Sequence, residues 1–127
     1  MCIRIILTLY VFNRVSRMTR EALGEFEQVV LLAILQLDGD VYGVPIVDEI
    51  QRRTSRNVAP AAVYVTLRRL ERKGLVESWM SDPTPERGGK ARLCVKVTRA
   101  GLASLRDARQ TINRMWKGLD PDLRKGR

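Results

Sequence analysis

Residues 61–72 contain side chains that are able to contact a nucleic acid. An arginine such as Arg68 can donate two hydrogen bonds to one guanine, and the hydroxyl group of Tyr64 can donate to a phosphate. Small alanines would let the backbone approach the floor of a groove, and Val65 could contact thymine methyl groups. The alternative is that the arginines only form a solvated face, as charge runs usually do. The candidate DNA-binding residues of this segment are Ala61, Ala62, Tyr64, Val65, Arg68 and Arg69.

A second group of cations lies in and beside a glycine-rich stretch further along the chain. Residues 82–90 contain two prolines and a Gly-Gly pair, which together predict the loop of a hairpin. An arginine at such a tip can enter a minor groove or hold its phosphates. A flexible loop with incidental charges is the alternative, but it explains less well why both segments are basic. The candidate DNA-binding residues here are Arg87, Lys90 and Arg92.

The composition favours a polyanionic partner, for which double-stranded DNA is the expectation. The 127 residues include 23 Lys and Arg against 14 Asp and Glu, a formal net charge of +9. Such an excess raises the local concentration of polyanions around a protein. There is no histidine, which removes the commonest general base and a frequent zinc ligand. We also find no phosphate-binding loop, dinucleotide glycine pattern or nucleophile–base pair. We therefore expect no enzyme, no cofactor and no metal.

The two cysteines, Cys2 and Cys94, are too few for a disulfide framework or a four-ligand zinc site. They suggest a reduced, cytoplasmic location, in which such thiols are usually small hydrophobic residues.

Apolar spacing predicts three helices ahead of the hairpin. They cover residues 19–38, a short segment after Tyr42-Gly43, and residues 59–73. Asp48-Glu49 is expected on the solvated face of the second helix. The third helix would bury one apolar stripe and leave its basic residues on another side. That stripe consists of Val63, Leu67 and Leu70.

Two strands are predicted after these helices, over residues 75–81 and 91–97. In the second strand, alternation places Leu93, Val95 and Val97 on one face and Arg92, Cys94 and Lys96 on the other. Trp79 is expected to pack at the base of the hairpin. Three helices, a hairpin and a last helix form a mainly α fold with a small β-hairpin, the winged helix-turn-helix order. In that fold the third helix enters the major groove and the hairpin is the wing.

The last helix, for which Thr98 is a plausible N-cap, has the 3-4 apolar spacing of a coiled-coil seam. The first helix has apolar residues all round its middle, so it needs cover on more than one side. In so small a chain a second subunit would provide that cover, which predicts a homodimer. The candidate dimerisation residues are Leu31, Leu32, Leu35, Leu102, Leu105, Ile112, Trp116 and Leu119.

Residues 1–17 form an N-terminal extension. Its apolar run is too short for a membrane span, which takes about 20 residues, and no cleavage site of a signal peptide follows. A wrongly chosen start codon, with Met18 as the true one, is one interpretation and a functional arm is the other. We expect the extension over 1–17, a winged helix-turn-helix DNA-binding domain over 18–98, and a dimerisation helix with a basic tail over 99–127.

Four motifs in this order resemble those of the PadR family of transcriptional regulators. They are LGEFE at 23–27, YG at 42–43, AVYVTLRRLERKGLV at 62–76 and TRAG at 98–101. The third motif is specific, whereas YG or TRAG alone would be weak. The resemblance covers residues 23–105. One departure is Leu93-Cys94-Val95, where the family often has aromatic residues, so a family-like aromatic contact at that place is in doubt.

The resemblance implies a homodimeric regulator, usually a repressor, that binds inverted-repeat operators. It also implies that the last helix of one subunit packs against the first helix of the other. Some members bind small aromatic effectors at the dimer interface, for which Trp116 is the candidate here; ordinary packing is the alternative for this side chain. For the whole protein, a winged helix used only for contacts with other proteins remains the rival interpretation.

Overall fold

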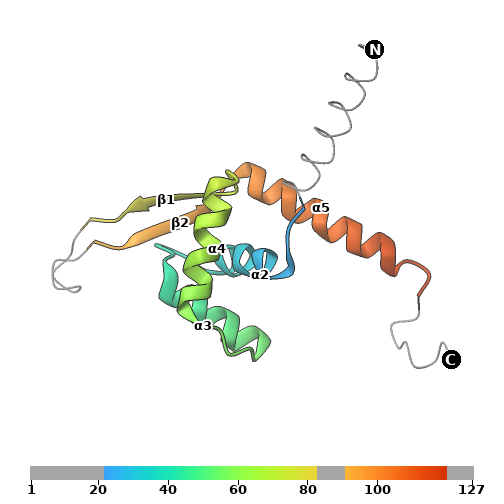
Figure 1. Cartoon of the computed structure of the whole chain (residues 1–127), viewed down its shortest axis with the longest axis horizontal. Helices are drawn as coiled ribbons and strands as arrows, with labels where there is room; N and C mark the ends of the chain where they lie inside the picture. The colour runs from blue at the N-terminus through green and yellow to red at the C-terminus, as the bar shows by residue number, and fades with distance from the viewer. Residues whose placement is uncertain (1–21, 83–90, 120–127) are drawn as a thin grey trace, which may run out of the picture.

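In the described part of the chain, three helices, an antiparallel strand pair and a long last helix follow one another (Figure 1). Figure 1 shows the computed structural model, in which residues 22–82 and 91–119 are described. The predicted extension over 1–17, the wing residues Arg87 and Lys90 and the basic tail lie outside the described residues. The elements are α2 (Glu25–Gln36), α3 (Gly43–Thr54), α4 (Pro60–Arg72), β1 (Val76–Met80), β2 (Leu93–Val97) and α5 (Arg99–Trp116).

The core lies where α2, α3 and α4 meet. Each helix has an apolar stripe, and burying these stripes against one another removes them from water. Val63 and Leu70 of α4 are fully buried and Leu67 nearly so, which confirms the predicted stripe. Leu31 of α2 is also fully buried in this core. Its assignment to the dimer surface is therefore wrong, because the subunit's own helices already enclose it.

The hairpin pairs β1 with β2 in an antiparallel register from Val76↔Val97 to Met80↔Leu93. The amide of Val95 also donates to the carbonyl of Val41 over 2.8 Å, so β2 has a neighbour on each edge. Cys94 and Val95, which are successive residues and so point to opposite faces of β2, are both buried. The predicted alternation assigns Leu93 and Cys94 to opposite faces but does not decide their burial: Cys94 is buried, whereas Leu93 is 45% exposed at the outer end of the ladder. Trp79 is likewise only partly covered, with 41% of its surface exposed.

The last helix, α5, begins at the predicted cap. The Thr98 hydroxyl oxygen accepts a hydrogen bond from the amide of Gly101 over 3.1 Å, and the hydroxyl donates to the carbonyl of Gly74 over 2.8 Å. Gly101 and Leu105 are buried, but the residues that follow become exposed as α5 extends away from the body (Figure 1). The second half of α5 therefore presents an uncovered apolar face.

In the described part of the chain, none of the helices has both the length and the apolar character needed to cross a membrane.

Candidate nucleic-acid interface

Helix α4 separates its apolar and polar residues onto different sides. It starts at Pro60, a favourable first helical residue because proline lacks the amide that would be unpaired there. Val63, Thr66, Leu67 and Leu70 are buried and hold the helix against the core. All six candidates of this segment are exposed and available to a ligand: Ala61, Ala62, Tyr64, Val65, Arg68 and Arg69.

Arg72 belongs to the same exposed side, although the predicted set does not include it. It lies one helical turn beyond Arg68, and these two arginines line one shallow hollow together with Glu71. The i, i+4 spacing of Arg68 and Arg72 is the signal in the sequence that would have found it.

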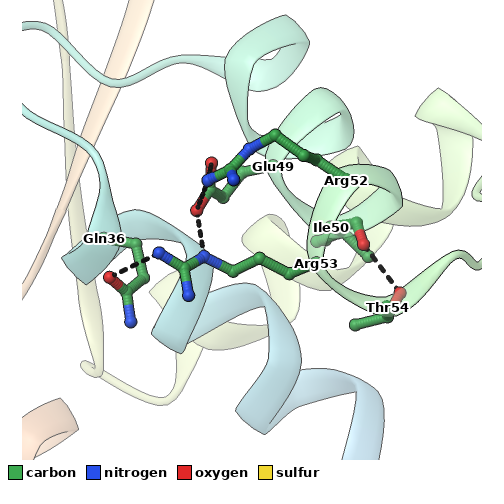
Figure 2. A network of polar contacts seen from close by, with 6 residues as sticks. All are labelled: Gln36, Glu49, Ile50, Arg52, Arg53 and Thr54. Carbon is green, nitrogen blue, oxygen red and sulfur yellow. Dashed lines mark hydrogen bonds and ion pairs between the residues drawn. The ribbon is translucent and has the colours of Figure 1, made fainter.

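The arginines of α4 make no ion pair within residues 22–82 and 91–119, whereas those of α3 do. Arg52 contacts Glu49 over 2.8 Å, and the Arg53 guanidinium donates to the same carboxylate (Figure 2). These hydrogen bonds, first from Arg53 and then from Arg52, hold the pKa of Glu49 below its ordinary value. The expectation of a solvated Asp48-Glu49 face is thus wrong for Glu49, whose side chain is 8% exposed.

Further polar contacts attach α3 and the segment that follows it to α2. Arg53 also donates to the side-chain carbonyl of Gln36 over 3.1 Å, which joins α3 to α2 (Figure 2). Arg56 pairs with Glu25. These contacts support the orientation of the helix pair that presents the exposed side of α4.

A partly buried ion pair at the end of α4 also reaches α2. Lys73 donates to Glu27 over 2.8 Å, and the same carboxylate accepts the amide of Gly24 over 2.9 Å. Burial raises the pKa of Glu27, but the hydrogen bonds from Lys73 and Gly24 outweigh this effect and leave the pKa below its ordinary value. Glu27 is therefore charged at neutral pH and connects the two helices.

At the outer end of β2, the Arg92 guanidinium lies over the ring of Tyr42, with its central carbon 4.2 Å from the ring centroid. Of the three predicted wing cations, Arg92 is the one within the described residues. The sequence presents Tyr42 and Gly43 only as a motif, and sequence reasoning missed their contacts with the candidate site. The pairing of an aromatic residue with a glycine at a helix start was the available signal.

The apolar surfaces of α2 and α5 form a separate groove of about 520 Å³. Leu32, Leu35, Leu102 and Ile112 line it, together with the buried Leu105. Trp116 and Leu119 instead line an open hollow at the end of α5 with Gln110 and Asn113. The structure thus divides the predicted seam between two neighbouring surfaces.

The arrangement of three helices, a two-stranded hairpin and a basic third helix defines a winged helix-turn-helix protein. A family model described as the transcriptional regulator PadR-like family matches residues 31–107. The chain therefore belongs to the PadR-like family, which is a family of transcriptional regulators and not of enzymes. A search of curated proteins finds no match.

Solved structures of PadR proteins show the same fold. A PadR family regulator from Clostridium difficile is 22% identical, with a TM-score of 0.61, over 74% of this chain and 93% of that one. One from Eggerthella lenta is 25% identical, with a TM-score of 0.58, over 87% and 93% of the two chains. A PadR-like regulator from Bacillus cereus is 23% identical, with a TM-score of 0.55, over 73% and 92%.

Proposed function

We propose that this protein is a sequence-specific DNA-binding regulator that acts as a homodimer on an inverted-repeat operator and represses transcription. The observation on which the proposal depends is the exposed side of α4. This side combines small residues at its start, a tyrosine and three arginines that form no ion pair in the described part of the chain.

The chemistry of α4 fits direct reading of a major groove. Tyr64 is 44% exposed and Val65 53% exposed, so both have surface left for a ligand. An arginine whose donors are not engaged by a carboxylate can bond guanine bidentately, and a β-branched apolar residue can contact a thymine methyl group. The wing residues Arg87, Lys90 and Arg92 would add contacts with phosphates or with the minor groove.

The groove between α2 and α5 supports the homodimer. Leu32 and Leu35 remain about half exposed, at 48% and 47%, and Ile112 of α5 is 52% exposed. Such contiguous apolar surface marks an interaction site in a soluble protein. A second copy of α5 would cover it, and two copies of α4 would then face one side of the DNA, about 34 Å apart.

The direct test is selection of bound sequences from a random DNA pool, followed by affinity measurements over a range of salt concentrations. We expect an inverted repeat, and an affinity that falls by about 0.9 log units per log unit of salt for each phosphate neutralised. Arg68→Ala should cost about 1–3 kcal/mol and relax the preference at one base pair per half-site.

Arg52→Ala is the matched control, because it removes the same charge from an arginine that is engaged with Glu49. It should change the affinity and the preferred sequence little. If the pool yields no preferred sequence and binding is insensitive to salt, the protein is instead a winged helix for protein contacts. Repression is tested separately: deleting the gene should raise expression from a promoter that contains the selected sequence.

A further inference from the structure

The start of α3 touches both parts of the proposed DNA-binding surface. Tyr42 is the N-cap residue of α3 and Gly43 is its first helical residue. Gly43 lies against the side chain of Tyr64 on α4, and Tyr42 lies under Arg92 at the outer end of β2. Two adjacent residues therefore connect α4 with the hairpin.

The contact between Gly43 and Tyr64 requires a glycine. A Cβ atom added to Gly43 would meet the Tyr64 hydroxyl oxygen, and it would lie 2.5 Å from Cζ and 2.9 Å from Cε1 of the ring. Real Cβ atoms do not approach other atoms so closely, so the ring would have to move. Because Tyr64 is 44% exposed, its side chain has solvent into which it can move without disturbing the core.

The contact between Tyr42 and Arg92 leaves the arginine competent to bind an anion. Stacking engages the flat face of a guanidinium, whereas its N–H groups point outward in the plane and match a phosphate. Arg92 forms no ion pair with a carboxylate in the described part of the chain. The Val95–Val41 hydrogen bond of 2.8 Å fixes β2 beside the same segment.

We propose that Tyr42 and Gly43 form a joint that positions both Tyr64 of α4 and Arg92 of the wing for contact with the DNA backbone. This inference rests on the proposed function. Neither joint residue needs to touch DNA itself; both are positioning residues. Gly43 acts by leaving room for the tyrosine ring, and Tyr42 acts by supporting the guanidinium.

The first test uses Tyr42→Leu, Tyr42→Phe and Arg92→Ala in the full chain, with the sequence selected from the random pool as the probe. Tyr42→Leu should weaken binding about two- to fivefold, the effect of removing one cation–π interaction. Tyr42→Phe retains the ring face and should bind like the wild type. Arg92→Ala should lower the salt slope by about 0.9 for each phosphate that the variant no longer neutralises.

The decisive measurement is Tyr42→Leu in the Arg92→Ala background. If Tyr42 acts through Arg92, Tyr42→Leu should cause no further loss of affinity once Arg92 has been replaced. An additive loss would overturn this half of the inference. So would a Tyr42→Leu variant that binds as tightly as the wild type.

The second test applies the same logic to the glycine. Gly43→Ala should weaken binding at least about tenfold if it displaces the Tyr64 hydroxyl from a phosphate, because this removes a hydrogen bond to a charged group. In a Tyr64→Ala background the added methyl group meets no ring, so Gly43→Ala should cost nothing more. Thermal unfolding of each variant should stay close to that of the wild type. A large drop in melting temperature, or additive losses, would show that Gly43 is needed for packing alone.

The wild-type chain separates failure of this inference from failure of the proposed function. If the wild type selects no sequence, the proposed function is wrong and the joint has no role to play. If the wild type binds its selected sequence and both double variants are additive, DNA binding stands and the joint is overturned.

Discussion

Two adjacent leucines of α2 should respond to the same substitution in different ways. Leu31 is fully buried in the core of its own subunit, whereas Leu32 is 48% exposed and lines the groove beside α5. We expect Leu31→Ala to destabilise the folded subunit and Leu32→Ala to weaken the proposed dimer. Because both positions lie mid-helix, the change in helix propensity is the same for the two variants and cancels in the comparison.

The magnitudes follow from the exposures. Removing a fully buried leucine side chain costs about 2–5 kcal/mol, which includes the cavity that is left. Burying a whole leucine side chain is worth about 1.5–3 kcal/mol. Covering the exposed half of Leu32 is then worth about half as much in each subunit, and a symmetric dimer contains two copies. The dimer should lose about 1.5–3 kcal/mol in total, or roughly 10- to 150-fold in its dissociation constant.

Sedimentation equilibrium measures the dissociation constant, and urea unfolding at several protein concentrations separates subunit stability from dimer stability. Leu32→Ala should shift the monomer–dimer equilibrium while the circular dichroism spectrum stays that of the wild type. Leu31→Ala should lower the unfolding midpoint at every concentration. If Leu32→Ala leaves the dissociation constant unchanged, α2 does not contribute to a dimer interface in the way that we propose.

Three further outcomes are expected. The pKa of Glu27 lies below its ordinary value of 4.5 in the folded state, so its ion pair with Lys73 stabilises the fold at neutral pH. This stabilisation is lost as the pH falls through the lowered pKa. Glu27→Gln should therefore weaken the fall in the free energy of unfolding at acid pH, as measured by urea unfolding. Gly101→Ala should lower the melting temperature, because the new Cβ would meet the carbonyl oxygen of Leu75 and lie 2.7 Å from a methyl group of Val97; an unchanged melting temperature would contradict this packing. If Trp116 binds an aromatic effector rather than only packing, planar aromatic compounds should quench tryptophan fluorescence saturably and Trp116→Ala should remove the response.

The parts of the fold that follow from one helical stripe were predictable from the sequence. On α4 the apolar residues recur at i, i+4 and i+7, and only one side of such a helix can reach the core. This decided in advance that Val63 would be buried and that Arg68 would be exposed, as the structure confirms. The Thr98 cap was also predictable, because a threonine oxygen ahead of an amphipathic run can accept a hydrogen bond from an otherwise unpaired amide of the first helical turn.

The parts that depend on which neighbour is present were not predictable. On α2, apolar residues on all sides indicate two covering surfaces but not which residue faces which, and Leu31 was therefore assigned to the wrong one. On β2, alternation assigns successive side chains to opposite faces but does not show which faces are covered, and Cys94 and Val95 are both buried. Residue type alone cannot show these arrangements, because they are made by contacts between distant segments.

The same limit applies to charge, and it bears most directly on the site. A net charge of +9 does not show which cations are available to a polyanion. On α3 the two arginines share Glu49, so a phosphate would have to compete with a carboxylate that is already desolvated and bonded. On α4, Glu71 is the neighbouring carboxylate, and it accepts a hydrogen bond from Ser78 over 2.8 Å without forming an ion pair with Arg68 or Arg72. An arginine without such a partner can neutralise a phosphate and so release the counterions condensed on the DNA, which is the favourable process in salt-dependent binding. The positions of the acidic residues thus decide that arginine stabilises helix packing on α3 and is free for phosphate and base contacts on α4.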